Sequence, residues 1–461
     1  MRLLLAATVA STFTAIITIL YPAHASEADA SLVKYGEYLA IAADCSGCHN
    51  SATKGLMAGG LALHSPMGDI FAPNITPDKK TGIGSWSEKQ FADALRRGIS
   101  PTRGSLYPAM PYTAYNGLID KDIHALYSYF MLGVPAIENA SKETHLPFPF
   151  FRIALPVWNY FYNRPYKIKV RKSFPQLERG RYLVDHLAHC STCHTPRNFM
   201  LAERQDAYLG GGKVWPWTAP NITPSEQGIG EWTTKDIRLF LTEGHNQYAV
   251  AGGDMGLTVQ QSLSHLTDDD IYSIALYLKS IPAYTNSPDL DKDPPKKASL
   301  SQPVTELQFN TEQQLDDQSL DGSRLYQAAC SSCHGVYGEG SQDGEHPSLW
   351  TNDTIRMKQP DNLINIISYG VHYRGLDQEH AMPGFVAKLN SAQIASLTNY
   401  VRNEFSGQSS QVTAEYVKKL SLYENNDYFI IKYVKIIIIL AIMCLASLIT
   451  SVLFWIRRKG G

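Results

Sequence analysis

Apolar residues with the spacing of amphipathic helices recur along this chain of 461 residues, and the segments that contain them come in pairs. Residues 31–43 and 120–131 form the first pair. We call the part of the sequence that this pair encloses the first stretch. Segments rich in Leu and Tyr at 267–280 and 391–405 end a second and a third stretch. Thr267 carries an N-cap signal for the first of these two. The pattern predicts a mainly α-helical protein.

One glycine stands inside each helical segment that opens a stretch, at Gly36, Gly180 and Gly322. Glycine in a helix interior costs about 1 kcal/mol relative to alanine, so its recurrence indicates a place where another helix passes close. We therefore expect the first helix of each stretch to cross the last helix of the same stretch.

Two longer apolar runs lie near the ends of the sequence. The first follows Arg2, covers residues 3–20 and precedes an Ala-His-Ala sequence typical of signal-peptide cleavage. A retained membrane anchor is the alternative interpretation of so long a run. We expect residues 1–25 to be a signal peptide that is removed on export.

The second run, residues 436–456, contains 21 uncharged and mostly apolar residues. A helix of that length spans roughly 30 Å, the thickness of the hydrocarbon core of a membrane. Lysines precede the run and three basic residues follow it, so the positive-inside rule places a tail of residues 457–461 in the cytoplasm. We expect one transmembrane anchor over residues 429–456.

Candidate chemistry comes from a C-x-x-C-H pattern that occurs three times, with its histidine at His49, His194 and His334. In this pattern two thiols bond covalently to the vinyl groups of a haem, and the histidine becomes a ligand of the iron. A zinc site needs a second Cys or His pair, and a thioredoxin-type pair requires no histidine directly after it. The pattern uses six of the seven cysteines, so we expect three covalent haems c held by Cys45, Cys48, Cys190, Cys193, Cys330 and Cys333.

A methionine on a constrained loop is the expected second axial ligand of each iron. Met110 and Met255 both lie 65 residues after the first cysteine of their pattern, and Met382 lies 52 residues after the first cysteine of the third. A proline follows Met110 and Met382 but not Met255, so His245 or His265 remains an alternative ligand in the second stretch. Other histidines are expected at the surface or near a propionate, namely His64, His124, His346, His372 and His380.

Two loops repeat between the first and second stretches. The sequence APNITP occurs at 72–77 and 219–224, and GIG followed one residue later by Trp occurs after each copy, ending at Trp86 and Trp232. Proline, asparagine and glycine make such loops rigid, and Ser87 with a glutamine three residues later forms a capping box that begins a helix. The two tryptophans either line a haem pocket or pack in a small core, and we favour packing.

These features divide the sequence into three tandem small cytochrome c domains, one for each haem pattern. The expected domains cover residues 26–140, 173–284 and 316–406, and linkers fill the intervals at 141–172, 285–315 and 407–428. The first linker contains an aromatic, proline-punctuated strip at 148–166, which is either a buried connector or a docking surface, and we favour the connector. The formal net charge of −2 gives no indication of nucleic-acid binding.

The three C-x-x-C-H patterns, the repeated loops, YPAMPY at 107–112, the AMPGF sequence around Met382 and the C-terminal apolar run together resemble a known family. They look like the tri-haem cytochrome c subunits of bacterial membrane-bound dehydrogenases that act on alcohols, gluconate, sorbitol, fructose or aldehydes. The resemblance implies that the chain has no catalytic residues. It implies a relay of electrons from a separate catalytic subunit through three haems to ubiquinone, on the periplasmic side of the inner membrane.

Two other functions compete with this interpretation. A haem enzyme of the peroxidase type needs an open iron position and a neighbouring acid-base group, and the three methionine candidates argue against one. A cytochrome subunit that donates electrons to a terminal oxidase remains an alternative. No G-x-G-x-x-G follows a strand, so a flavin or nicotinamide is expected on the partner rather than on this chain. A flavoprotein partner is favoured, and a quinoprotein or a molybdoprotein stays open.

Overall fold

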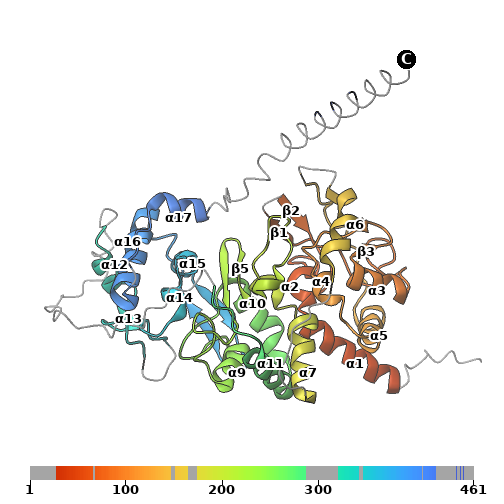
Figure 1. The fold of residues 1–461 in the computed structure, drawn as a ribbon, viewed down its shortest axis with the longest axis horizontal. Coiled ribbons are helices and arrows are strands. Elements are labelled where there is room, and N and C mark those ends of the chain that lie inside the picture. Colours follow the sequence, from red (N-terminus) through yellow and green to blue (C-terminus); the bar gives the residue numbers. More distant parts are fainter. Residues whose placement is uncertain are drawn as a thin grey trace, which may run out of the picture.

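The protein is described by a computed structural model that covers residues 27–65, 68–146, 151–164, 174–286, 320–341, 346–407 and 409–421, together with 443, 447 and 450. Its helices and short antiparallel hairpins fall into three groups along the chain (Figure 1). We call the described residues of 27–146 the first group, those of 174–286 the second group and those of 320–421 the third group.

Helices dominate the first and second groups, and each also contains short antiparallel hairpins. The first group consists of α1 (Glu27–Ala42), α2 (Cys45–His49), β1 (Ala62–Ser65), β2 (Gly68–Phe71), α3 (Glu88–Arg97), β3 (Ile99–Ser100), β4 (Gly104–Ser105), α4 (Tyr112–Tyr115) and α5 (Asp120–Ser128). The second consists of α7 (Pro175–Tyr182), α8 (Ser191–His194), β5 (Gly210–Val214), β6 (Trp217–Asn221), α9 (Thr234–Glu243), α10 (Gly253–Gln261) and α11 (Asp268–Ser280).

The third group also begins with one helix followed by a short second one, and a separate helix lies between the first two groups. The third group consists of α12 (Gly322–Ala329), α13 (Ser331–His334), α14 (Asp353–Arg356), α15 (Asp361–Tyr369), β7 (Val371–Arg374), β8 (Glu379–Met382), α16 (Ser391–Val401) and α17 (Ala414–Ser421). The separate helix is α6 (Phe151–Tyr162), and wider helical turns extend α5, α7 and α16 over Tyr129–Gly133, Leu183–Leu187 and Arg402–Ser406.

The first helix of each group crosses α5, α11 or α16, respectively, at the glycine that the sequence singles out. A Cβ atom added to Gly36 would lie 2.0 Å from the carbonyl oxygen of Ala125, and one added to Gly180 would lie 1.9 Å from that of Ser273. In the third group, the corresponding distance from Gly322 is 2.6 Å. No side chain fits at these distances, so the expectation of a close helix crossing is confirmed in all three groups.

The helix caps that the sequence predicts at Ser87 and Thr267 are also present. Ser87 caps α3 with a complete capping box in which the side chain of Gln90 accepts from the backbone N–H of Ser87. The side chain of Thr267 accepts from the backbone N–H of Asp270 at the start of α11. These bonds satisfy N–H groups that a helix N-terminus otherwise leaves without partners.

Two buried carboxylates join the first group to the second. Asp122, the third residue of α5, accepts hydrogen bonds from Tyr35 at 2.9 Å within its own group and from Tyr182 of the second group at 2.7 Å. Asp270, the third residue of α11, mirrors it and accepts from Tyr38 of the first group at 2.6 Å. Its ion pair within the second group, with Arg179, measures 2.7 Å.

These reciprocal bonds relate the first two groups by an approximate twofold symmetry. One continuous hydrophobic core runs through both groups, whereas a separate cluster fills the third. The third group instead contacts the second through the β5–β6 hairpin, where Lys213 pairs with the buried Asp361 at 3.1 Å. It also contacts α9 and α10, and the hydroxyl of Tyr373 donates to the carbonyl oxygen of Gly244 at 2.7 Å.

Several sequence predictions lie outside the described residues. They are the signal peptide at 1–25, most of the linker at 285–315, and nearly all of the anchor and tail at 429–461. Within the part of the chain that the structure describes, no helix is long and apolar enough to cross a membrane.

Replacing Gly36 by alanine should destabilise the first group, because the added Cβ collides with the backbone of α5. Overpacking of this kind costs about 1–3 kcal/mol, and we expect a clearly lower midpoint of thermal unfolding followed by circular dichroism. Lys34→Ala, on an exposed position of the same helix, is the matched control and should leave the midpoint nearly unchanged. Equal midpoints for the two variants would contradict the close crossing.

Candidate functional site

Each C-x-x-C-H pattern forms a short helical turn directly after the first helix of its group, at α2, α8 and α13. The residues that precede the first two turns, Asp44 and His189, have positive φ angles of 46° and 41° and redirect the chain. None of the six cysteines of the patterns forms a disulfide. Burial raises the pKa of the Cys45 and Cys190 thiols to about 12, which keeps them protonated in the absence of a bonding partner.

The three histidines share one hydrogen bond that fixes their ring orientation. The Nδ1 atom lies 2.8 Å from the carbonyl oxygen of Pro73 in His49 and 2.7 Å from that of Pro220 in His194. In the third group, Nδ1 of His334 lies 3.1 Å from the carbonyl oxygen of Pro347. A carbonyl oxygen only accepts, so Nδ1 must carry the proton and Nε2 holds the lone pair that a metal requires.

Burial also keeps these rings neutral. It lowers the pKa of His49, His194 and His334 below the usual value for histidine, and the proline carbonyl opposes that shift only in part. A neutral imidazole with a protonated Nδ1 bound to a backbone carbonyl is the form in which histidine binds iron or zinc.

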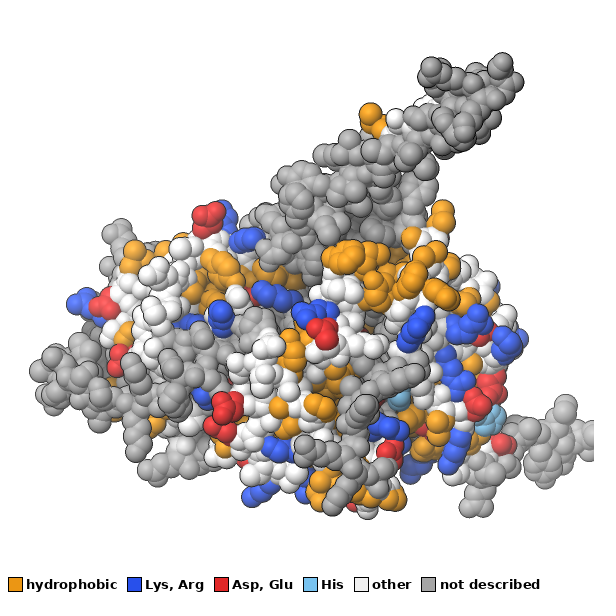
Figure 2. Space-filling view, viewed as in Figure 1, with side chains coloured by type: hydrophobic (Ala, Val, Ile, Leu, Met, Phe, Trp, Pro, Cys, Tyr) orange, Lys and Arg blue, Asp and Glu red, His pale blue; other side chains and the backbone are white. Residues whose placement is uncertain are grey.

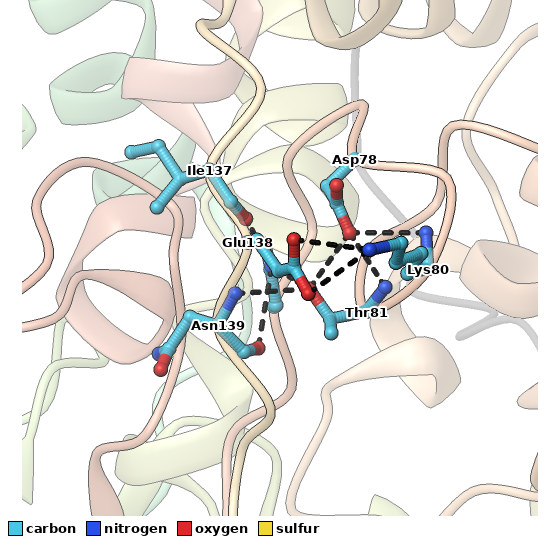
Figure 3. A network of polar contacts seen from close by, with 7 residues as sticks. Asp78, Lys80, Thr81, Ile137, Glu138 and Asn139 are labelled. Carbon is cyan, nitrogen blue, oxygen red and sulfur yellow. Dashed lines mark hydrogen bonds and ion pairs between the residues drawn. The ribbon is translucent and has the colours of Figure 1, made fainter.

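A buried asparagine beside the proline braces the loop that provides this carbonyl in the first two groups. In the first group, Asn74 donates to the carbonyl oxygen of Ile137 at 2.7 Å and to the hydroxyl of Thr81 at 2.9 Å. Figure 3 shows how this loop is connected to residues 137–139, where Asn139 donates to Thr81 and Glu138 pairs with Lys80. The loop is thereby attached to the chain segment that follows the last helix of its group.

The second group repeats this arrangement. Asn221 donates to the carbonyl oxygen of Tyr284 at 2.9 Å and accepts from the backbone N–H and the hydroxyl of Thr223. The duplicated APNITP sequence therefore provides two functions in adjacent residues, a carbonyl for the histidine and an amide that anchors the loop. Sequence reasoning identified the loops as rigid but did not assign the proline carbonyls, although the exact repetition was the available signal.

The candidate methionine ligands all lie at the edges of the hydrophobic cores. Met110 precedes α4, Met255 lies in α10 and Met382 ends β8, and each is partly buried against core residues. Met382 packs against the core of the third group as well as the shared core of the first two. The geometry is consistent with residues that complete an apolar pocket, and the choice of axial ligand stays a prediction.

The competing histidines have different surroundings. His265 is exposed, and its Nε2 atom lies 3.1 Å from the carbonyl oxygen of Gln260. The ring of His245 lies 4.5 Å from that of His380 in the third group, measured between centroids, and its buried Nδ1 has no hydrogen-bond partner. His64, His124 and His372 face acidic side chains at the surface, as expected of polar surface residues.

Trp86 and Trp232 belong to the shared core, as the packing interpretation expects. Trp232 stacks on Tyr248 with a centroid distance of 5.8 Å and contacts Phe240 at 5.3 Å. Trp86 packs against the same core, and its backbone carbonyl accepts from the hydroxyl of Tyr127 at 2.7 Å.

The first two C-x-x-C-H turns are connected directly across the interface between their groups. Nε2 of His189 lies 3.2 Å from the carbonyl oxygen of Ala43, two residues before the first pattern. The hydroxyl of Thr258, on the helix that carries Met255, donates to Asp44 at 3.3 Å. The backbone that precedes one turn is thus positioned by residues of the other group.

These features fit covalently bound haem at each turn. A thioether linkage to haem requires free thiols, and the paired cysteines form no disulfide. Nε2 is the histidine nitrogen that remains available for the iron. Cys45 and Cys190 pack against the shared hydrophobic core, so the first two turns lie in apolar surroundings of the kind that tune a haem.

Comparison with known proteins agrees with this assignment. The cytochrome c family model matches residues 319–404. The fructose dehydrogenase cytochrome subunit of Gluconobacter japonicus is 41% identical over 84% of this chain and 82% of its own length. This chain belongs to the family of dehydrogenase cytochrome c subunits.

Further relatives in this family serve different dehydrogenases. The gluconate 2-dehydrogenase cytochrome c subunit of Pantoea cypripedii is 36% identical over 86% of this chain and 90% of its own length. The cytochrome c subunit of the alcohol dehydrogenase (quinone) of Gluconobacter oxydans is 33% identical over 86% and 84%. Dehydrogenase cytochrome c subunits bind haem c covalently and transfer electrons, which the C-x-x-C-H turns and their oriented histidines explain.

Asn221 braces the loop whose Pro220 carbonyl orients His194, so replacing Asn221 should make the position of this histidine less fixed although the two side chains are not bonded to each other. Asn221→Ala leaves buried backbone groups of residues 223 and 284 without their partner, which costs about 1–3 kcal/mol. We expect a lower unfolding midpoint and a broadened haem Soret band. Glu226→Ala, exposed on the same loop, is the control, and a variant at Asn221 that matches it would refute the bracing role.

Proposed function

We propose that this chain relays electrons through three covalently bound haems c from a catalytic dehydrogenase subunit to ubiquinone. The observation that carries the proposal is the threefold repetition of one arrangement. In each group a C-x-x-C-H turn follows the first helix, and a proline carbonyl orients the histidine. One such turn per group supports one haem per domain, with the domain boundaries expected from the sequence.

Each residue of the arrangement has a defined role in this proposal. The cysteine pairs would hold the haem by thioether bonds, and Nε2 of His49, His194 and His334 would be a ligand of its iron. Met110, Met255 and Met382 would be the second protein ligands, so that no position would remain for substrate. Bound haem supplies one-electron exchange, and the chain's ligands and burial set the potential at which it occurs.

The route of electrons is supported by the direct contact between the first two groups. His189 and Thr258 of the second group bond to Ala43 and Asp44, directly before the first turn, so these contacts hold the two C-x-x-C-H turns close to each other. The third group docks on the second through the Lys213–Asp361 pair and the hydroxyl of Tyr373. Chains of haems held rigidly in this way favour transfer between neighbours because little reorganisation accompanies each step.

The membrane placement follows from the sequence. An export signal at 1–25 and an anchor at 429–456 put the haem domains on the periplasmic side of the bacterial inner membrane, with residues 457–461 in the cytoplasm. The relative named as part of an alcohol dehydrogenase (quinone) supports a quinone as acceptor. The partner acts on a sugar, sugar acid or alcohol, and the high identity to the fructose dehydrogenase subunit favours a sugar.

The haem count gives the first test. The purified mature protein should contain three haems per chain in a pyridine haemochrome assay, and Cys193→Ala should contain two, because one thioether bond to the second haem is lost. Cys444→Ala is the control and should keep three, since this cysteine lies outside the patterns. A wild-type ratio of one or two would refute the proposed number.

The axial ligand of the third haem gives the second test. Met382→Ala should open the iron, so that carbon monoxide binds to the reduced protein and part of the near-infrared methionine-to-iron band disappears. Met357→Ala, in which a fully buried core methionine is removed, controls for the loss of packing and should leave the band intact. An unchanged spectrum in the Met382 variant would transfer the ligand role to another residue.

Electron flow gives the third test. The isolated chain should oxidise no sugar, alcohol or aldehyde. Its haems should be reduced within seconds after its dehydrogenase partner and substrate are added, and a soluble ubiquinone analogue should reoxidise them. Reduction by substrate alone would contradict the subunit role. Reoxidation by an added terminal oxidase, and never by quinone, would favour the oxidase donor as the function.

A further inference from the structure

Helix α6 directs several polar side chains toward the first group and four large apolar side chains toward solvent, although Leu155 is buried, and an ordinary surface helix shows the reverse arrangement. Its inward face is attached to the first group by hydrogen bonds. Arg152 donates to the carbonyl oxygen of Arg103 at 2.7 Å, and Asn159 accepts from the buried hydroxyl of Tyr112 at 2.8 Å. Asn163, one turn later, donates to the carbonyl oxygen of Arg96 at 3.0 Å.

The outward face of α6 carries large apolar side chains that are mostly exposed. Ile153 is 74% exposed, Val157 62%, Tyr160 70% and Phe161 59%. A turn of the second group extends this surface, since Trp158 donates to the carbonyl oxygen of Met200 at 2.9 Å. Figure 2 shows hydrophobic side chains gathered at the upper right of the molecule, where Figure 1 places α6. Aqueous solvent does not favour such a face, so it requires a covering partner.

The composition of α6 distinguishes between the partners that could cover it. Residues 151–164 contain Trp, Tyr and Phe, an arginine near each end and no acidic residue. Helices that lie in the interface of a membrane combine aromatic and aliphatic residues on one face with basic flanks. Aromatic rings of Trp and Tyr are enriched at the depth of the lipid headgroups. This chemistry fits a bilayer that contains anionic lipid.

The position of α6 agrees with this partner. Figure 1 places α6 and α17 along the same upper edge of the molecule, whereas α1, α5 and α7 lie along the lower edge. The apolar run at 436–456 follows α17 in the sequence. A bilayer along the edge that α6 and α17 share would be near the end of α17, from which the chain continues to this run, and would also meet α6.

We propose that the outward face of α6, formed by Ile153, Val157, Tyr160 and Phe161, lies in the headgroup region of the bilayer as a second membrane contact. The inference rests on the proposed membrane location of the chain and adds an orientation to it. With the C-terminal anchor as one point of attachment and α6 as another, the haem domains are held at a constant tilt to the membrane surface.

Nitroxide accessibility tests this orientation in the full, haem-loaded chain. A spin label is attached to Val157→Cys in a Cys444→Ala background, and the protein is incorporated into vesicles of phosphatidylethanolamine and phosphatidylglycerol. Oxygen concentrates in the bilayer and a nickel chelate stays in water. We expect the label on residue 157 to collide mainly with oxygen. A label on Lys34→Cys, exposed on α1 at the lower edge, should collide mainly with the nickel chelate.

Each outcome of this experiment is decisive. An unchanged haem spectrum shows that the variant folds, and Phe161→Cys repeats the measurement one turn along the same face. If the labels on residues 157 and 161 are accessible to the nickel chelate in a chain that floats with the vesicles, the inference is overturned but the proposed anchor stays intact. Protection only after the dehydrogenase subunit is added would also overturn it and make the face a subunit interface. A chain that does not float with the vesicles would overturn both proposals.

Discussion

The close crossing of two helices at a glycine is the constraint on which each group depends. Contact between the backbones at Gly36, Gly180 and Gly322 sets the distance between the first helix and the last helix of the group. The C-x-x-C-H turn begins directly after the first helix, so this crossing also sets where the cysteines and the histidine lie. In the first two groups, the loop that carries the proline carbonyl is held by residues that follow α5 or α11, which closes the arrangement around the histidine.

The third residue of α5, α11 and α16 differs between groups that associate in different ways. In the first two groups it is Asp122 or Asp270, and each carboxylate receives hydrogen bonds from both groups. In the third group the same position is Gln393, whose side chain instead completes the capping box of α16. The third group therefore lacks the reciprocal contact and docks through a different surface, the hairpin and helices near Asp361.

The C-x-x-C-H turns and helix α6 show opposite properties of this scaffold. The three histidines of the C-x-x-C-H turns are partly buried, and short bonds to proline carbonyl oxygens fix the orientation of their rings. Helix α6 is attached by equally specific bonds, but these direct its apolar side chains outward. In both places a few specific hydrogen bonds determine which side chains are held in place and which remain exposed.

The sequence by itself predicted the crossing helices and several of their caps, and it indicated the candidate residues for haem attachment. These features depend on residues close together in the chain, such as the C-x-x-C-H spacing or Ser87 with Gln90, or on a single permissive residue such as Gly180. Only the tertiary structure decided that proline carbonyls orient the histidines, that Asp122 and Asp270 join two groups, and that α6 faces outward. Each of these depends on which distant segments pack together, and periodicity along the chain shows that a helix has two faces without showing which one is covered.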